Sequence, residues 1–190
     1  MLNQPRDARG VTLIELMVGI AILSILLGMA VPSFRAWIQN GKVRTAAESI
    51  QNGLQIARVE AIQRNTWVQF DLRDDGIGGA WTVCEPPLPL SVPPDPCPDP
   101  DDDSTIQSRS GAEGSSAAVT VEIEEGAVPV VFSAAGRVRE SGGNIEFLVD
   151  TSALDAAESR ELRIIVYPSG GLRMCEDSFG EGSADPRACP

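Results

Sequence analysis

Residues 11–31 read VTLIELMVGIAILSILLGMAV, and Glu15 is their only ionisable side chain. As an α-helix with a rise of about 1.5 Å per residue, this segment would be roughly 31 Å long. That length is enough to cross the hydrocarbon core of a bilayer, which is about 30 Å thick. The segment therefore predicts a transmembrane helix over residues 11–31.

The ten residues before this helix, MLNQPRDARG, are polar and end at Gly10. A secretory signal has an apolar region of about 7–15 residues that is followed by a small-residue cleavage site. Here the small residue comes before the apolar run, and the run continues past Pro32 into further helical sequence. We therefore expect the apolar helix to be retained in the mature chain.

Glu15 is unusual because a carboxylate inside a lipid-spanning helix is costly unless it lies near the interface or has a partner. Two interpretations are open. If the chain is cut between Gly10 and Val11, the α-amino group of a neighbouring subunit can pair with this carboxylate. Alternatively, the side chain extends to the cytoplasmic surface and stays hydrated.

The order of these residues, Gly10 followed by Val11-Thr12-Leu13-Ile14-Glu15 and an apolar helix, resembles the class III signal of type IV pilins and pseudopilins. The resemblance implies that a prepilin peptidase removes residues 1–10 as a leader by cutting after Gly10. It further implies that Val11 is then N-methylated and that Glu15 aids subunit docking. Pro32 matches the proline that kinks or loosens the pilin helix, consistent with a lost backbone hydrogen bond.

Residues 32–65 continue as helical sequence with one apolar stripe, which we expect to face a sheet. The stripe consists of Val43, Ala47, Ile50, Leu54, Ala57 and Ala61, at alternating spacings of four and three. Gly41 and Gly53 are each expected to weaken the helix by about 1 kcal/mol. Asn65 is a plausible C-terminal stop.

After Asn65 the sequence changes to short runs typical of β-strands, separated by glycine-rich turns. The expected strands are Thr66–Leu72, Ala80–Cys84, Val119–Ile123, Val130–Ser133, Ile145–Val149, Leu162–Tyr167 and Leu172–Cys175. A long helix followed by such strands predicts an α+β fold, in which the helix packs on antiparallel β-sheet in a head formed by residues 66–190.

The four cysteines form two pairs along the chain, Cys84 with Cys97 and Cys175 with Cys189, and neither pair has metal-ligand spacing. An even number of cysteines in a membrane-tethered chain suggests disulfides formed outside the cytoplasm. Three connectivities are possible, and the sequential one needs only local loop closure.

Residues 85–116 are rich in Pro, Asp and Ser, and we expect them to form a long exposed insertion. Asp99, Asp101 and Asp103 alternate as the first ligands of a calcium loop do. The surrounding prolines and the lack of a downstream bidentate glutamate favour a solvated acidic loop instead of a calcium site.

The head extends the resemblance. The helix end ARVEAIQRN, then VFSAAGRV, SGGNIEF and LRIIVYPSGGLRMC, resemble the GspH/FimT family of minor pilins and pseudopilins. The resemblance implies a pilin-like, non-enzymatic subunit that needs no cofactor or metal. It would be a single-pass protein of the bacterial inner membrane with its head in the periplasm, from where it enters a pilus or pseudopilus.

In that family the implied role is to prime filament assembly near the tip, with other minor pilins, the major pilin and an inner-membrane assembly platform as partners. A type IV pilus and a type II secretion system both remain open. The chain has no histidine, which excludes a Ser-His-Asp triad and histidine-based metal ligation.

Some FimT-like members bind DNA for transformation through a C-terminal Gly-Arg-x-Arg motif. The equivalent place here reads Gly170-Gly171-Leu172-Arg173 and lacks one arginine, whereas a literal copy occurs earlier as Gly136-Arg137-Val138-Arg139. Arg137, Arg139 and Arg173 are therefore the candidate DNA contacts. The formal net charge of −12 repels a phosphate backbone, so DNA binding is an alternative that we do not favour.

Overall fold

The computed structural model describes residues 11–190, except 74–77, 114, 126–128, 140–141 and 180–182. The chain divides into an N-terminal unit that ends at Trp37 and a second unit, Ile38–Pro190, which we call the head unit.

One long helix, α1 (Leu13–Arg64), contains both of the helical segments that the sequence predicts. Its C-terminus is closed at Asn65, which has a positive φ of 51°. The backbone N–H of Asn65 donates to the carbonyl of Ile62, and that of Thr66 donates to Ala61. These two bonds form a Schellman motif, so Asn65 ends the helix as expected.

Within the described part of the head unit, eight strands follow α1 and form two antiparallel four-stranded sheets. The first sheet has the order β3-β2-β1-β5 and the second has the order β4-β6-β7-β8. The strands are β1 (Val68–Arg73), β2 (Ala80–Cys84), β3 (Thr105–Arg109), β4 (Val119–Glu125), β5 (Val130–Phe132), β6 (Ile145–Thr151), β7 (Leu162–Val166) and β8 (Leu172–Glu176). A short 3-10 helix, Asp177–Phe179, comes after β8.

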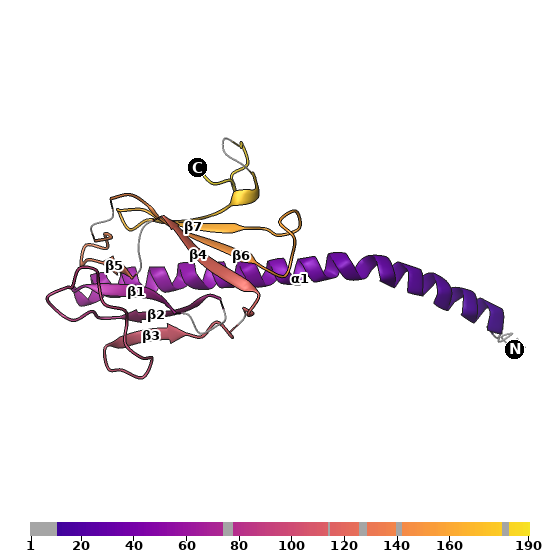
Figure 1. The fold of residues 1–190 in the computed structure, drawn as a ribbon, viewed down its shortest axis with the longest axis horizontal. Coiled ribbons are helices and arrows are strands. Elements are labelled where there is room, and N and C mark those ends of the chain that lie inside the picture. The colour runs from indigo at the N-terminus through magenta and orange to yellow at the C-terminus, as the bar shows by residue number, and fades with distance from the viewer. Residues whose placement is uncertain (1–10, 74–77, 114, 126–128, 140–141, 180–182) are drawn as a thin grey trace, which may run out of the picture. The chain divides into compact units, whose positions relative to one another are not determined.

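Both sheets lie along the C-terminal part of α1 within the head unit (Figure 1). The predicted apolar stripe of the helix is fully buried against them, and it forms one core cluster with residues from both sheets. Phe70 of β1 and Phe147 of β6 meet edge to face, with ring centroids 6.3 Å apart. The core is therefore shared by α1 and both sheets, which confirms the predicted α+β fold.

Strands β1 and β6 direct one face to the core because apolar residues alternate along them. In β6, residues 145, 147, 149 and 151 are buried while those between them are only partly covered. In β1, Val68, Phe70 and Leu72 contribute to the core cluster. The side chains that alternate with them, Gln69, Asp71 and Arg73, therefore point to the outer face of the sheet.

The prediction that residues 85–116 are an exposed loop throughout is wrong at β3. Strand β3 pairs with β2, from Trp81 opposite Arg109 to Cys84 opposite Thr105. Ile106 is the one large apolar residue in the sequence TIQSR, so the segment has no alternation of the kind that reveals a half-buried strand. The strand forms because β2 offers an unpaired edge, which is a long-range effect.

Candidate functional site

The first turn of α1 places Glu15 three residues after the capping residue Thr12. The hydroxyl oxygen of Thr12 accepts a hydrogen bond from the backbone N–H of Glu15 (3.3 Å), and its carbonyl accepts one from Leu16 (3.2 Å). Thr-x-x-Glu is the sequence of a capping box, and a carboxylate is favoured at a helix N-terminus. Glu15 is exposed, so its carboxylate is open to a partner.

Thr12 was missed as a functional residue, although its spacing to Glu15 could have revealed the capping box. Val11 is described and exposed, whereas Gly10 and the rest of the predicted leader lie outside the described residues. Cleavage after Gly10 and methylation of Val11 therefore stay predictions.

The large apolar side chains of the N-terminal part of α1 are all exposed within their unit. They are Leu13, Ile14, Leu16, Met17, Val18, Ile20, Ile22, Leu23, Ile25, Leu26, Leu27, Met29 and Val31. The helix is long and apolar enough to cross a membrane. A helix that is apolar on all sides needs lipid or other helices around it, so this surface is the main candidate assembly surface.

The two serine hydroxyls in this part of α1 are satisfied inside the helix. The hydroxyl of Ser24 donates to the carbonyl of Ile20 (2.8 Å), and that of Ser33 donates to Ala30 (3.0 Å). Such back-bonding lets serine lie in lipid without an unpaired donor. Pro32 lies within α1 and has no N–H, so the carbonyl of Gly28 lacks its usual helical donor.

In the head unit, the structure joins Cys84 to Cys97 and Cys175 to Cys189, the sequential connectivity. The Cα atoms are 5.9 Å and 5.1 Å apart, within the normal range for disulfides. Cys97 belongs to the predicted insertion and is buried. The first disulfide therefore fixes that part of the insertion to strand β2.

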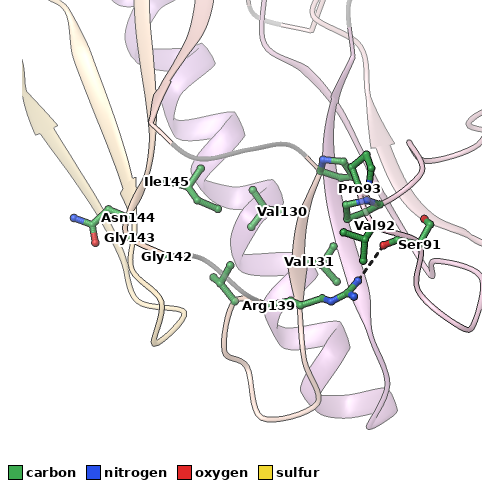
Figure 2. Close-up of a pocket in the computed structure, with 13 residues that line it drawn as sticks. Ser91, Val92, Pro93, Val130, Val131, Arg139, Gly142, Gly143, Asn144 and Ile145 are labelled. Carbon is green, nitrogen blue, oxygen red and sulfur yellow. Dashed lines mark hydrogen bonds between the residues drawn. The ribbon is translucent and has the colours of Figure 1, made fainter.

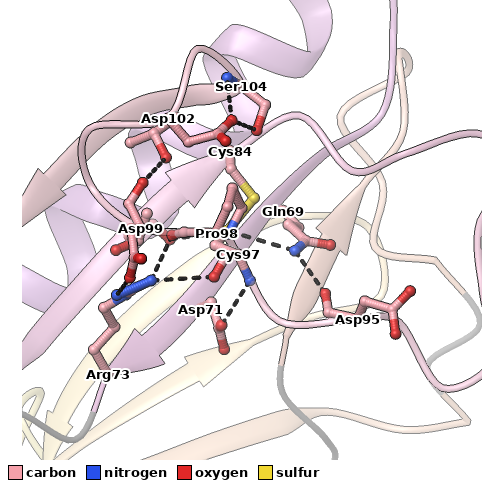
Figure 3. Close-up of a disulfide and its surroundings, with 12 residues drawn as sticks. Gln69, Asp71, Arg73, Cys84, Asp95, Cys97, Pro98, Asp99, Asp102 and Ser104 are labelled. Atoms are coloured by element: carbon pink, nitrogen blue, oxygen red, sulfur yellow. Dashed lines mark hydrogen bonds and ion pairs between the residues drawn. A yellow bond between two sulfur atoms is a disulfide. The ribbon is translucent and has the colours of Figure 1, made fainter.

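The polar outer face of β1 holds the same part of the insertion, residues 95–98 (Figure 3). The amide of Gln69 donates to the carbonyl of Asp95 (2.9 Å). The guanidinium of Arg73 donates to the carbonyls of Cys97 (3.1 Å) and Pro98. Alternate polar residues of one strand thus bind the backbone of a loop that covers the sheet, a role that the sequence pattern does not reveal.

Asp71 is the buried charge of this contact, with 7% of its surface exposed. One of its carboxylate oxygens accepts a hydrogen bond from the backbone N–H of Cys97 (3.0 Å). Burial raises the pKa of the Asp71 carboxyl, and the hydrogen bond and the nearby charge of Arg73 only partly oppose this rise.

The three candidate DNA contacts differ in their surroundings. Arg137 is exposed, whereas Arg139 and Arg173 are half-buried. The Arg139 guanidinium donates to the carbonyl of Ser91 (3.3 Å), and that of Arg173 donates to Ala188 (2.9 Å). Two of the three guanidinium groups are thus engaged by the chain's own backbone.

Gly136, the first residue of the Gly-Arg-x-Arg copy, is needed for the turn itself. Its φ is +70°, and its carbonyl accepts a hydrogen bond from Arg58 of α1 (3.2 Å). The neighbouring turn contains Gly170, where an added Cβ would lie 1.8 Å from the Gly136 carbonyl oxygen. The turn conformation therefore explains why glycine occupies position 136, without any role in DNA binding.

Arg139 also lines a pocket of about 310 Å³. Figure 2 shows its guanidinium directed towards Ser91, with Val131 and Val92 close by. Most other lining residues are apolar or glycine, including Pro93, Val130 and Ile145. Among its described lining residues, the pocket is thus mainly an apolar hollow in which the one charged side chain, Arg139, already has a partner.

Within the described ranges, no cluster of three or more Cys, Asp and Glu side chains is arranged to hold a metal ion. In the acidic part of the insertion, a carboxylate oxygen of Asp102 accepts hydrogen bonds from the N–H and the hydroxyl of Ser104. A carboxylate oxygen of Asp99 lies 3.6 Å from a guanidinium nitrogen of Arg73. These contacts make Asp102 and Asp99 parts of a turn and an ion pair.

Two sequence models match different parts of the chain. Residues 46–170 match the model of the type II transport protein GspH, and residues 5–31 match the prokaryotic N-terminal methylation motif. A stretch of 71 residues is 38% identical to the pilin-like protein PilA1 of Thermus thermophilus. That alignment covers 37% of this chain and 44% of the relative, so the chain spans less than half of that relative's length.

Among solved structures, the type IV minor pilin FimU of Pseudomonas aeruginosa has a similar fold. One crystal form superposes with a TM-score of 0.53 at 15% identity, over 75% of this chain and 95% of FimU. A second crystal form gives a TM-score of 0.50 at 13% identity, over 75% and 99%. At this identity the likeness establishes the fold alone.

Proposed function

The chain belongs to the GspH family of type IV pilin-like proteins, and we propose that it is a minor subunit that helps to initiate a type IV pilus as part of its tip complex. The major pilin, other minor pilins and an inner-membrane assembly platform would be its partners.

The observation that carries this proposal is the exposed apolar surface of α1 beside the exposed carboxylate of Glu15. Lipid would cover that surface while the chain is anchored in the inner membrane, and the helices of neighbouring subunits would cover it in the filament. Prepilin peptidase would free the α-amino group of Val11. A carboxylate in an apolar surrounding needs a cation, and this group on a neighbouring subunit supplies one.

The two disulfides support a head that lies outside the cytoplasm, because disulfides persist in oxidising compartments such as the periplasm. The acidic insertion is anchored on the sheet by one of them, so it forms part of a folded surface. An acidic surface that is cross-linked by a disulfide suits a subunit exposed on a pilus.

Deleting the gene in the native host and restoring it with a tagged copy tests the proposal. We expect the deletion to reduce the number of filaments, and the restored chain to be found at low copy with label at one filament end. Label along the whole filament, or an unchanged number of filaments in the deletion strain, would contradict a role in initiation.

A second candidate is a minor pseudopilin of a type II secretion system, which is favoured by the family model over residues 46–170. The same deletion strain separates the two functions when exported enzymes and surface filaments are measured together. Loss of secretion with normal piliation would support the pseudopilin.

A further inference from the structure

Two aromatic side chains lie just beyond the apolar segment of α1 and are not covered by the rest of their unit. Phe34 and Trp37 stack on each other, with ring centroids 5.9 Å apart and an angle of 27° between the planes. Their exposed fractions are 59% and 71%. Aromatic rings of this size are seldom so exposed to water without a partner surface.

These rings continue the apolar surface of the preceding turns. Leu27, Val31, Phe34 and Trp37 follow one another at spacings of four, three and three, which places them on one side of the helix. Together with Ala30 and Ser33 they line a shallow groove. The aromatic pair is therefore continuous with the surface that faces lipid in the anchored chain.

The depth of the pair follows from the rise of the helix. Phe34 and Trp37 lie three and six residues beyond Val31, or about 4.5 Å and 9 Å further along the axis. The polar zone on each side of the hydrocarbon core is about 5–7.5 Å thick. Since helical side chains point back towards the N-terminus, the Trp37 ring lies nearer the core than its Cα atom does.

The chemistry of the neighbouring residues fits that zone. Tryptophan is enriched at membrane interfaces because its ring is apolar while its N–H donates to polar oxygens. Arg35 is the first ionisable residue after Glu15, and its cation complements anionic lipid headgroups.

We propose that Phe34 and Trp37 lie in the headgroup region of the bilayer and fix the depth of α1 in the membrane. The inference rests on the proposed membrane anchoring and adds the binding surface that sets its position. Entry into a filament then requires this pair to leave the lipid headgroups.

Tryptophan fluorescence of the full chain in vesicles of phosphatidylethanolamine and phosphatidylglycerol tests the proposal. A fraction of the lipid carries bromine either near the headgroup or near the end of the acyl chain, since bromine quenches tryptophan on contact. We expect stronger quenching by bromine near the headgroup. The lipid-quenched emission should be lost in Trp37→Phe and kept in Trp67→Phe, which changes a tryptophan beyond the end of α1.

Stronger quenching by the deeper bromine, or quenching that survives in Trp37→Phe, would overturn the proposal. The absence of lipid quenching even at the lowest protein-to-lipid ratio would also overturn it, because Trp37 would then not lie in lipid. Sedimentation of the vesicles at high pH distinguishes failure of the aromatic anchor from failure of membrane anchoring itself. A chain that stays with the vesicles without lipid quenching refutes the aromatic anchor alone, whereas a chain released from them refutes membrane anchoring as well.

Discussion

The indole N–H of Trp81 donates a hydrogen bond to the hydroxyl of Ser49 across 2.9 Å, and both residues are buried. This bond joins α1 to strand β2 inside the core. A buried indole needs such an acceptor because an unpaired donor is costly away from water.

We expect Ser49→Ala to lower the free energy of unfolding by about 1–3 kcal/mol, since it leaves the Trp81 N–H unpaired. Denaturation of the full chain in detergent, followed by circular dichroism, measures the change. Thr45→Ala is the matched control on the same helix, because the Thr45 hydroxyl donates to the Gly41 carbonyl of its own helix and to no other group among the described residues. Equal stability of Ser49→Ala and wild type would show that the bond contributes nothing.

The two glycines in the head part of α1 should respond in opposite ways to alanine. A Cβ at Gly53 would lie 2.7 Å from a ring atom of Phe70 and 2.8 Å from one of Trp81, whereas nothing lies within 4 Å of a Cβ at Gly41. Gly41→Ala should therefore stabilise the chain by up to about 1 kcal/mol. Gly53→Ala should destabilise it by about 1–3 kcal/mol through overpacking. Thermal unfolding of both variants is the measurement, and stabilisation of Gly53→Ala would refute the packing argument.

Asp71 should make the stability of the chain depend on pH. Because its pKa is raised by burial, the folded state binds this proton more tightly than the unfolded chain does. Its contribution is therefore greatest below the ordinary pKa of aspartate and decreases as the pH rises through the raised pKa. Asp71→Asn keeps an oxygen that can accept from Cys97 and stays neutral.

The stability of Asp71→Asn relative to wild type should thus increase with pH across that window and then level off. Urea denaturation at a series of pH values measures it, with the exposed Asp103→Asn as control. A constant difference between Asp71→Asn and wild type would mean that the carboxyl titrates alike in both states.

We expect the full chain to show no salt-sensitive binding to duplex DNA in gel-shift assays. The net charge is −12, and the guanidinium groups of Arg139 and Arg173 already donate to backbone carbonyls. A retarded complex that dissolves with added salt, and that Arg137→Ala weakens, would instead support the DNA-binding alternative.

Local sequence pattern was sufficient to predict most of the fold. The spacing of Val43, Ala47 and Ile50 predicted the buried stripe of α1, and Asn65 predicted its end, because both depend on neighbours within a few residues. The apolar segment and Glu15 likewise stand out without any tertiary information.

Features that depend on distant residues could not be predicted in this way. Strand β3 lacks an alternating pattern and forms by pairing with β2. From sequence alone, Gly53 is expected to destabilise the helix, but its missing side chain makes room for Phe70 and Trp81. The hydrogen bonds from β1 to the insertion join residues more than twenty positions apart, so the local pattern of the strand gives no sign of them.

Glu15→Gln tests the central claim most directly, because glutamine keeps the capping-box geometry with Thr12 and removes only the charge. The measurement is the amount of the chain in sheared filaments of the native host, with removal of the leader checked on the same samples. If Glu15 docks the subunit through its charge, Glu15→Gln will be processed normally and will be missing from the filaments. Recovery of Glu15→Gln in filaments at the wild-type level would contradict the account.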